Sequence, residues 1–564
     1  VGGVAAIAVL TRVILNRNDS APPRTMVIAF DNNTGDPSLN SLGSLVADWT
    51  ATEIGASGIT PVSPTMRTLS TGPRSTARAS SADLAMKAVT SDGYAYAVGG
   101  AIYKSNDSII VSPVVVSSRS KAMLASIRPV RVAPGQLERA ADDVAQMVTG
   151  ALAVAMNEHV SVLRTAAERA PRYDAYVQYL EGLELFHDDQ RNAAYQAFAR
   201  ARDADSTFLL PIIWQAFAVP TRRPLRDSLT RVLESYGERL SPLEHYAAGY
   251  LRADLDDDQQ AALQNALRAA ALAPGSNWSY NAATKLALFN KPREALELVS
   301  KVDPHTWVGN WPAFWRFYIA TAHGAGDDAL AYKLIDKAQN FGVSPLVLLR
   351  FHMMLEAAGG NEAGVTEDYK QYTAITSARD SLMLFFAIGV NEAAFHGHPG
   401  LRRKLGDSLI SVVTVPGDTS ADRLALLADA YVTAGRNNEA WPLAIRYRPR
   451  ATDSAWTFGL LGLIAARTNR RVEALAYADS LAALKSGDKG YVTWNRARIY
   501  AALHDDQRAL RLIRQTYAER KQIMWQHGSD FEELKGNKEF EALRDPDGAA
   551  KRSISLVAAA DSGR

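Results

Sequence analysis

Short apolar runs and amphipathic stretches alternate over the first part of the chain. The apolar run at residues 26–30 is typical of a buried strand, and Asp36-Pro37 after it is typical of a helix start. Further along, "YAYAVGGAIY" and "SIIVSPVVVS" are joined by a polar turn, which predicts a β-hairpin. An amphipathic helix from Leu137 to about Glu158 follows. These elements predict a compact α/β domain over residues 25–160.

From Tyr173 onward the chain is helical and alanine-rich, without a convincing strand pattern. Small residues recur where the two helices of a hairpin would touch, at a spacing of about 34 residues. The clearest hairpin carries Gly462 and Ala474 at these positions. The pattern is degenerate in the hairpins at residues 311–340, 345–372 and 381–412. The spacing predicts all-α helical repeats over residues 171–545.

The first domain resembles the TolB amino-terminal-type domain. The resemblance rests on a strand, a turn and a helix start that carry Phe30, Asn33, Gly35, Asp36 and Pro37. A second block is matched by Gly99, Gly100 and the turn at residues 105–108. Bacteria attach such a domain to signalling proteins, including Ser/Thr kinases. The resemblance therefore implies a binding or sensing role, with no catalytic residues assigned.

The helical region resembles a divergent tetratricopeptide (TPR) array. Such hairpins stack into a right-handed superhelix, because one hairpin cannot bury its own apolar face. The concave groove of such a superhelix binds peptides or protein segments. The repeat positions that line the groove are occupied by Asn277, Tyr280, Trp456, Trp494 and Arg498. Aromatic and arginine side chains suit a partner-binding groove, although tryptophans also fill gaps between divergent repeats.

Arginines gather at the junctions between repeats. They are Arg446, Arg448, Arg450, Arg467, Arg470 and Arg471. Such a cluster either meets an acidic partner or forms solvated surface, and solvated surface is the commoner case.

The chain opens with an apolar stretch at residues 1–16 that Arg12 interrupts. It is shorter than a full span, which needs about 20 residues, so it predicts a truncated transmembrane segment. The alternatives are the remnant of a signal peptide or a buried helix. Residues 17–24 then form a linker. This interpretation predicts a single-pass bacterial membrane protein whose remaining part is periplasmic or cytoplasmic, with a slight preference for the periplasm. The tail at residues 546–564 is predicted to be disordered.

Composition and motifs argue against an enzyme. There are 62 Lys and Arg against 60 Asp and Glu, so no overall field attracts nucleic acid. The absence of Cys excludes thiolate metal sites and Cys nucleophiles. The polar turn "FDNNTGDPSLNSLG" fits neither a calcium loop nor a phosphate loop, and Asn33, Gly35 and Asp36 are explained by turn and cap geometry. His396-Gly-His398 is the one close histidine pair, and a structural role is favoured for it.

The predicted fold is therefore a small α/β (TolB N-terminal-like) domain followed by an all-α tetratricopeptide-like superhelix. The predicted function is the non-catalytic protein-interaction or sensor region of a bacterial membrane-anchored signalling protein, with a protein or peptide partner. We expect no cofactor, no metal and no nucleic acid. Two alternatives stay open: a free-standing envelope adaptor, and the regulatory C-terminal part of a Ser/Thr kinase whose kinase domain lies upstream.

Overall fold

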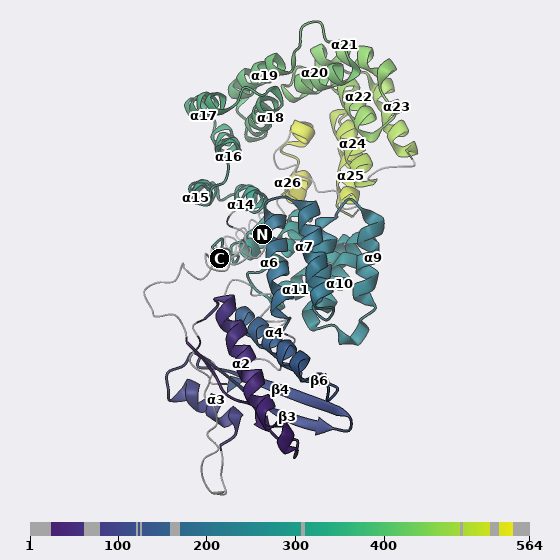
Figure 1. Cartoon of the computed structure of the whole chain (residues 1–564). Helices are drawn as coiled ribbons and strands as arrows, with labels where there is room; N and C mark the ends of the chain where they lie inside the picture. Colours follow the sequence, from purple (N-terminus) through teal and green to yellow (C-terminus); the bar gives the residue numbers. More distant parts are fainter. Residues whose placement is uncertain are drawn as a thin grey trace, which may run out of the picture. The chain divides into compact units, whose positions relative to one another are not determined.

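The structure is a computed structural model of the chain (Figure 1). It describes residues 24–60, 62, 79–119, 122–123, 127–157, 170–305, 309, 311–484, 489–518 and 529–544. The chain divides into two compact units. The first unit runs to Ser279 and takes in a short loop after Lys301, and the second unit contains the remaining residues from Tyr280 onward.

The described part of the first unit begins with a mixed β-sheet and the α-helices that accompany it. The strands are β1 (Thr25–Val27), β2 (Asp31–Asn32), β3 (Tyr96–Ser105), β4 (Ser108–Ser117), β5 (Ala122–Met123) and β6 (Val130–Val132). β1 and β2 pair parallel with β3, while β4 pairs antiparallel with β3, β5 and β6. The helices are α2 (Asn40–Ser57), α3 (Ser81–Thr90) and α4 (Leu137–Met156). The predicted hairpin of β3 and β4 is confirmed, with Ser105 opposite Ser108.

The polar turn after β1 is held by its own side chains. The carboxylate of Asp36 accepts a hydrogen bond from the backbone N–H of Ser38 at 3.0 Å, so the predicted cap is confirmed at a short 3₁₀ turn, Pro37–Leu39. Hydrogen bonds from Ser38 lower the pKa of Asp36. Asn32, not Asn33, supplies the side chain that accepts from Thr34. The geometry is that of a strand-to-helix turn.

The rest of the described chain consists mainly of paired antiparallel helices. The pairs of the first unit are α6 (Tyr173–His187) with α7 (Arg191–Ala204), α8 (Leu210–Ala218) with α9 (Arg223–Glu234), and α10 (Pro242–Leu255) with α11 (Gln259–Leu272). The boundary between the units falls inside α12 (Asn277–Leu288), which is followed by α13 (Pro292–Val299).

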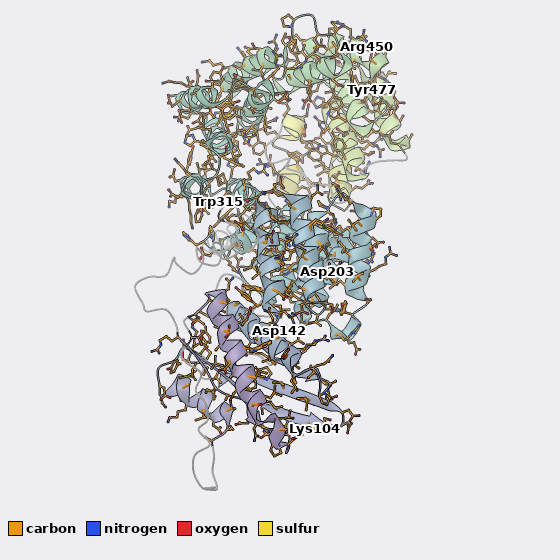
Figure 2. All side chains as sticks on the ribbon, in the orientation of Figure 1. Lys104, Asp142, Asp203, Trp315, Arg450 and Tyr477 are labelled. Atoms are coloured by element: carbon orange, nitrogen blue, oxygen red, sulfur yellow. The ribbon has the colours of Figure 1, made fainter. Side chains whose placement is uncertain are left out.

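The second unit continues the same arrangement. Its pairs are α14 (Pro312–Gly324) with α15 (Asp328–Asn340), α16 (Pro345–Ala358) with α17 (Glu362–Ile375), α18 (Arg379–His396) with α19 (Pro399–Val413), α20 (Ala421–Thr433) with α21 (Asn437–Tyr447), α22 (Ala455–Arg467) with α23 (Arg471–Ala483), and α24 (Lys489–Ala502) with α25 (Asp506–Ala518). The three hairpins with degenerate sequence patterns form helix pairs like the others. Their cores include large side chains, such as the fully buried Trp315 of α14 (Figure 2).

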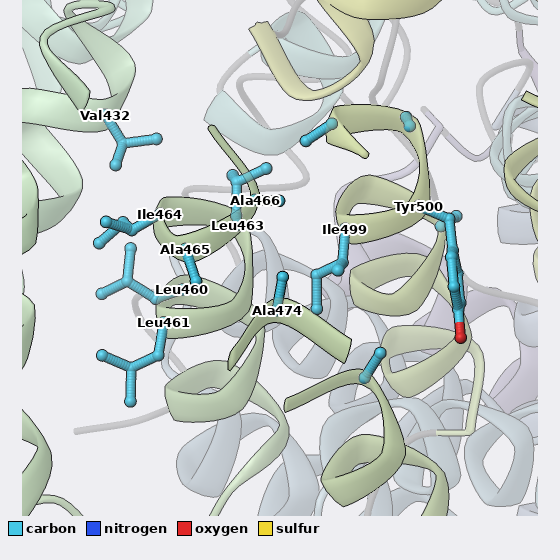
Figure 3. Close-up of a cluster of buried hydrophobic side chains, with 14 of the residues drawn as sticks. Val432, Leu460, Leu461, Leu463, Ile464, Ala465, Ala466, Ala474, Ile499 and Tyr500 are labelled. Atoms are coloured by element: carbon cyan, nitrogen blue, oxygen red, sulfur yellow. The ribbon is translucent and has the colours of Figure 1, made fainter. Parts of the chain in front are cut away.

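Small residues let the helices of a pair approach closely. A Cβ added to Gly182 of α6 would lie 2.5 Å from the ring of Phe198 on α7. In the second unit, Ala465 of α22 and Ala474 of α23 are fully buried in one cluster with Ile499 and Tyr500 of α24 (Figure 3). The small-residue pattern found in the sequence therefore marks real contacts, and it explains why the helical hairpins stack into a repeat array.

No helix among the described residues is long and apolar enough to cross a membrane. The predicted single-pass membrane location, on either the periplasmic or the cytoplasmic side, is contradicted by this finding. The strongly apolar α22 illustrates the reason: its 13 residues extend only about 20 Å, and its apolar faces pack on neighbouring helices. Residues 1–16, on which the prediction depended, and residues 546–564 lie outside the described part of the chain.

Candidate functional site

The segment at residues 529–544, which we call the C-terminal segment, packs onto the second unit. It consists of a 3₁₀ stretch, η5 (Ser529–Leu534), and the short helix α26 (Lys538–Arg544). In Figure 1 it lies between α18 and α24, on the inner side of the arc formed by α18 to α25. Its backbone packs mainly against α18, α24 and α25, and side chains of α19 and α22 also reach it. The segment thus covers an inner face of the helical array.

Apolar side chains anchor the C-terminal segment. Phe531 is 4% exposed, and its ring lies edge-to-face against Trp494 of α24 at a centroid distance of 4.5 Å. Phe540 is also buried, with its ring 5.8 Å from that of Phe531. Leu534 is buried in the same cluster as the residues of α20 to α25. These side chains complete the core of the last hairpins.

Three arginines from three helices meet the carboxylates of η5. Arg498 of α24 pairs with Asp530 at 2.7 Å, and Arg402 of α19 pairs with Glu532 at 2.8 Å. Arg467 of α22 donates to Glu533 at 2.7 Å and lies 3.2 Å from Glu532. The Arg467 side chain is only 4% exposed. Burial would lower the pKa of Arg467, but the carboxylates of Glu533 and Glu532 outweigh it and raise the pKa, so the guanidinium stays charged.

Polar contacts to main-chain carbonyl groups hold the segment at the end of α26 and in the turn between η5 and α26. The side-chain amide of Asn290 donates to the carbonyl oxygens of Leu543 and Arg544, at 2.8 Å each. Lys535 donates to the carbonyl oxygen of Phe395 in α18 at 3.2 Å. The segment is therefore fixed by directional contacts as well as by apolar burial.

A polar cavity of about 500 Å³ adjoins the pair of Arg467 and Glu533. Its walls include Asn437, Asn469 and His504. The C-terminal segment thus leaves space next to its central ion pair, on the same face.

The five residues predicted to bind a partner fall in different environments. Trp494 and Arg498 belong to the face just described, where the C-terminal segment covers them. Asn277 is buried in the first unit, whereas Tyr280 packs against Trp311 with ring centroids 4.9 Å apart. Trp456 is 38% exposed at the start of α22. The structure does not test their role in partner binding, which stays a prediction.

The arginines that cluster in the sequence likewise have different surroundings in the structure. Only Arg467 reaches the carboxylates of the segment. Arg470 stacks on Trp441, and Arg448 pairs with Asp453. Sequence reasoning missed Arg402, and it did not recognise the C-terminal segment. The signal that it overlooked is a phenylalanine within the acidic run "SDFEEL", shortly after the last hairpin.

A second group of polar side chains lies elsewhere in the second unit. His323 of α14 and His396 of α18 both approach Glu392, at 3.4 Å and 3.5 Å, and Asp328 of α15 accepts from His323 at 2.5 Å. Burial alone would lower the pKa of His323, but hydrogen bonds to Asp328 and Glu392 outweigh it and raise the pKa to about 9. His398 is separate, because its Nε2 donates to the carbonyl oxygen of Ala358. The group contains the residue types of a metal site, although the sequence predicted none.

Comparisons with known proteins give little further identification. No family model matches the chain, and no curated protein matches it. The TolB-like resemblance of residues 25–160 thus finds no support there. A monomeric mutant of IFIT1 with Gppp-AAAA is one solved structure that matches, at 13% identity. The match covers 65% of this chain and 90% of that chain with a TM-score of 0.30, which is too low to carry an argument. The helical-repeat architecture rests on the helix pairs themselves.

Proposed function

We propose that the second unit is a protein-interaction module that binds an acidic protein segment containing a phenylalanine. The binding face is the one that the C-terminal segment covers. The observation that carries the proposal is the set of arginines from α19, α22 and α24 that meet carboxylates on both sides of the buried Phe531. The chain's own segment serves as the template for the partner.

The chemistry of the face favours such a partner. Arginine guanidinium groups are planar and present fixed pairs of donors, which suits carboxylate recognition. With the segment in place, Arg467 is buried and its guanidinium contacts both Glu532 and Glu533, so an acidic partner would meet a largely desolvated charge there. Trp494 offers the edge or face of an indole to an aromatic anchor. Apolar burial supplies affinity, and the ion pairs set register and sequence preference.

The resident segment regulates access in this proposal. A tethered segment acts at an effective concentration on the order of 1 mM. If the free segment binds with a Kd of about 10 µM, the tethered copy occupies the face about 99% of the time. An external partner then binds about 100-fold more weakly than it would to the open face. A partner with extra contacts, for example to the cavity beside Arg467, overcomes this competition.

The test uses a fluorescent peptide with the sequence of residues 529–544, titrated with the full chain and followed by anisotropy. We expect weak binding to the natural chain and clearly tighter binding to Phe531→Ala, whose own segment is released. When Arg467→Met or Arg498→Met is combined with Phe531→Ala, the increase in peptide affinity should be lost. A peptide with its acidic residues replaced by lysine is the matched control. Equal binding of both peptides, or no gain with Phe531→Ala, would refute the proposal.

The role of the first unit rests on the TolB-like resemblance alone. We propose that its α/β part is a sensor or regulatory module of a bacterial signalling protein, and that neither unit is catalytic. An upstream Ser/Thr kinase and a free-standing adaptor are the two arrangements to distinguish. The genomic reading frame that encodes the residues before Val1 decides between them, because a kinase would show its catalytic-loop motifs there.

A further inference from the structure

His323, Glu392 and His396 bring three potential metal ligands together from two helices. His323 lies in the last turn of α14, whereas Glu392 and His396 are four residues apart on one face of α18. The Nε2 atoms of both imidazoles face the same carboxylate oxygen of Glu392, at 3.4 Å and 3.5 Å. One ligand atom of each residue lies within 4.8 Å of the others. No other group of three or more such side chains was found within the described residues.

The separations match the edges of a tetrahedral coordination shell. Zinc bonds to imidazole nitrogen and carboxylate oxygen are about 2.0–2.2 Å long, so two ligands at a tetrahedral angle lie about 3.3–3.5 Å apart. Both contacts to Glu392 already have this length. Only the spacing between the two imidazoles, whose ring centroids lie 5.7 Å apart, has to adjust. A bound zinc ion would therefore require the His396 side chain, which is partly exposed, to rotate.

A further carboxylate holds His323 in the orientation that a metal needs. Asp328, the first residue of α15, accepts a hydrogen bond from His323 Nδ1 at 2.5 Å. The carboxylate can only accept, so this contact fixes the proton on Nδ1, and Nε2, which donates to Glu392 in the metal-free protein, is the nitrogen that would bind the metal. In zinc sites, an imidazole that binds the metal usually donates its other ring N–H to a carboxylate in this way.

The burial of the Glu392 carboxylate and the dipoles of two helices also favour a cation at this position. The side chains of Glu392 and His323 are 2% and 3% exposed, so a carboxylate lies deep in the protein where a charge needs strong compensation. The His396 side chain is 33% exposed and leaves a route from solvent. The site lies at the C-terminal ends of both α14 and α18, where the helix dipoles add negative potential.

We propose that His323, Glu392 and His396 form a zinc-binding site, with Asp328 as the residue that orients His323. Two imidazoles and one carboxylate are a donor set that zinc prefers, and they leave a fourth position for water or another ligand. The metal would join α14 to α18 across the hairpin of α16 and α17, and so fix the curvature of the array in this region. The proposal is independent of the peptide-binding face.

The experiment uses the full chain, stripped with a chelator and dialysed. Zinc chloride is titrated calorimetrically, and bound metal is measured by mass spectrometry after gel filtration. We expect about one zinc per chain, and a cobalt-substituted sample should show the visible absorption of a tetrahedral site. His396→Gln is the decisive variant, because its side chain is the most exposed of the three and its loss should leave the fold intact. We expect it to weaken zinc binding by about 100-fold or more.

His398→Gln is the matched control, since His398 lies two residues further on and bonds the carbonyl of Ala358 instead. This variant should bind zinc like the natural chain. Circular dichroism shows whether each variant is folded. Failure of the natural chain to bind stoichiometric zinc would overturn the proposal and leave a histidine–carboxylate ion-pair network. Equal zinc binding by folded His396→Gln would also overturn it.

Discussion

Phe531→Ala is the sharpest perturbation of the C-terminal segment. Removing a buried phenylalanine costs about 3–5 kcal/mol, because the site cannot fully collapse around the cavity. The edge-to-face contact with Trp494 accounts for about 0.5–1.5 kcal/mol of this. A segment that is docked about 99% of the time is held by about 2.7 kcal/mol. The loss therefore equals or exceeds the docking free energy, and the variant segment should be released more than half of the time.

Amide hydrogen exchange, resolved by peptide fragments, measures this release directly. In the natural chain, amides of residues 529–544 should exchange slowly, because they open only about 1% of the time. In Phe531→Ala they should exchange on the order of 50-fold faster or more, while the amides of α18 to α24 keep most of their protection. Circular dichroism should show nearly unchanged helix content. Lys538→Ala, at an exposed position of the same segment, is the control and should exchange like the natural chain.

Two outcomes would refute this reasoning. If Phe531→Ala leaves the segment as protected as before, the aromatic anchor does not hold it. If the whole second unit loses protection together, the segment is an integral part of the cooperative core, and it cannot act as a displaceable occupant.

Three further predictions concern other parts of the chain. Gly43→Ala should destabilise the α/β part by about 1–3 kcal/mol in urea unfolding, because the added Cβ would lie 2.1 Å from the carbonyl oxygen of Phe30. A Cβ added at Gly55 in the same helix would meet open space, so Gly55→Ala should instead stabilise the α/β part by about 0.5–1 kcal/mol. Equal changes in stability for the two variants would contradict the packing argument. Burial, with help from a nearby arginine, lowers the pKa of His187 from 6.5 to about 3, so below pH 6.5 the unfolded chain binds a proton that the folded chain does not. The contribution of His187 to the free energy of unfolding should therefore be complete above pH 6.5 and fall by up to about 1.4 kcal/mol per pH unit below it, and His187→Phe should remove this fall. Finally, Trp456→Ala should leave the melting temperature nearly unchanged because the side chain is exposed, and a large drop would show that it packs in the core.

The sequence by itself determined most of the secondary structure. Apolar spacing predicted the hairpin of β3 and β4, and small residues such as Gly182 marked helix contacts, because these signals are local and repeat with the period of the element. The same reasoning treated the region from residue 311 to 412 as degenerate, although it forms helix pairs. The pair of α14 and α15 buries Trp315 together with Ala322, Ala331 and Ala338, so the helices pack although the residue spacing did not mark them clearly.

The tertiary structure alone decided where the candidate sites lie. Arg402 and Glu532 are 130 residues apart, and His323 and Glu392 are 69 residues apart, so no local spacing connects either pair. Periodicity identified Trp494 as part of a helix face, but it could not show that the chain's own Phe531 covers that face. The physical reason is that a helical period specifies which side chains share a face, whereas the stacking of whole hairpins determines what that face meets.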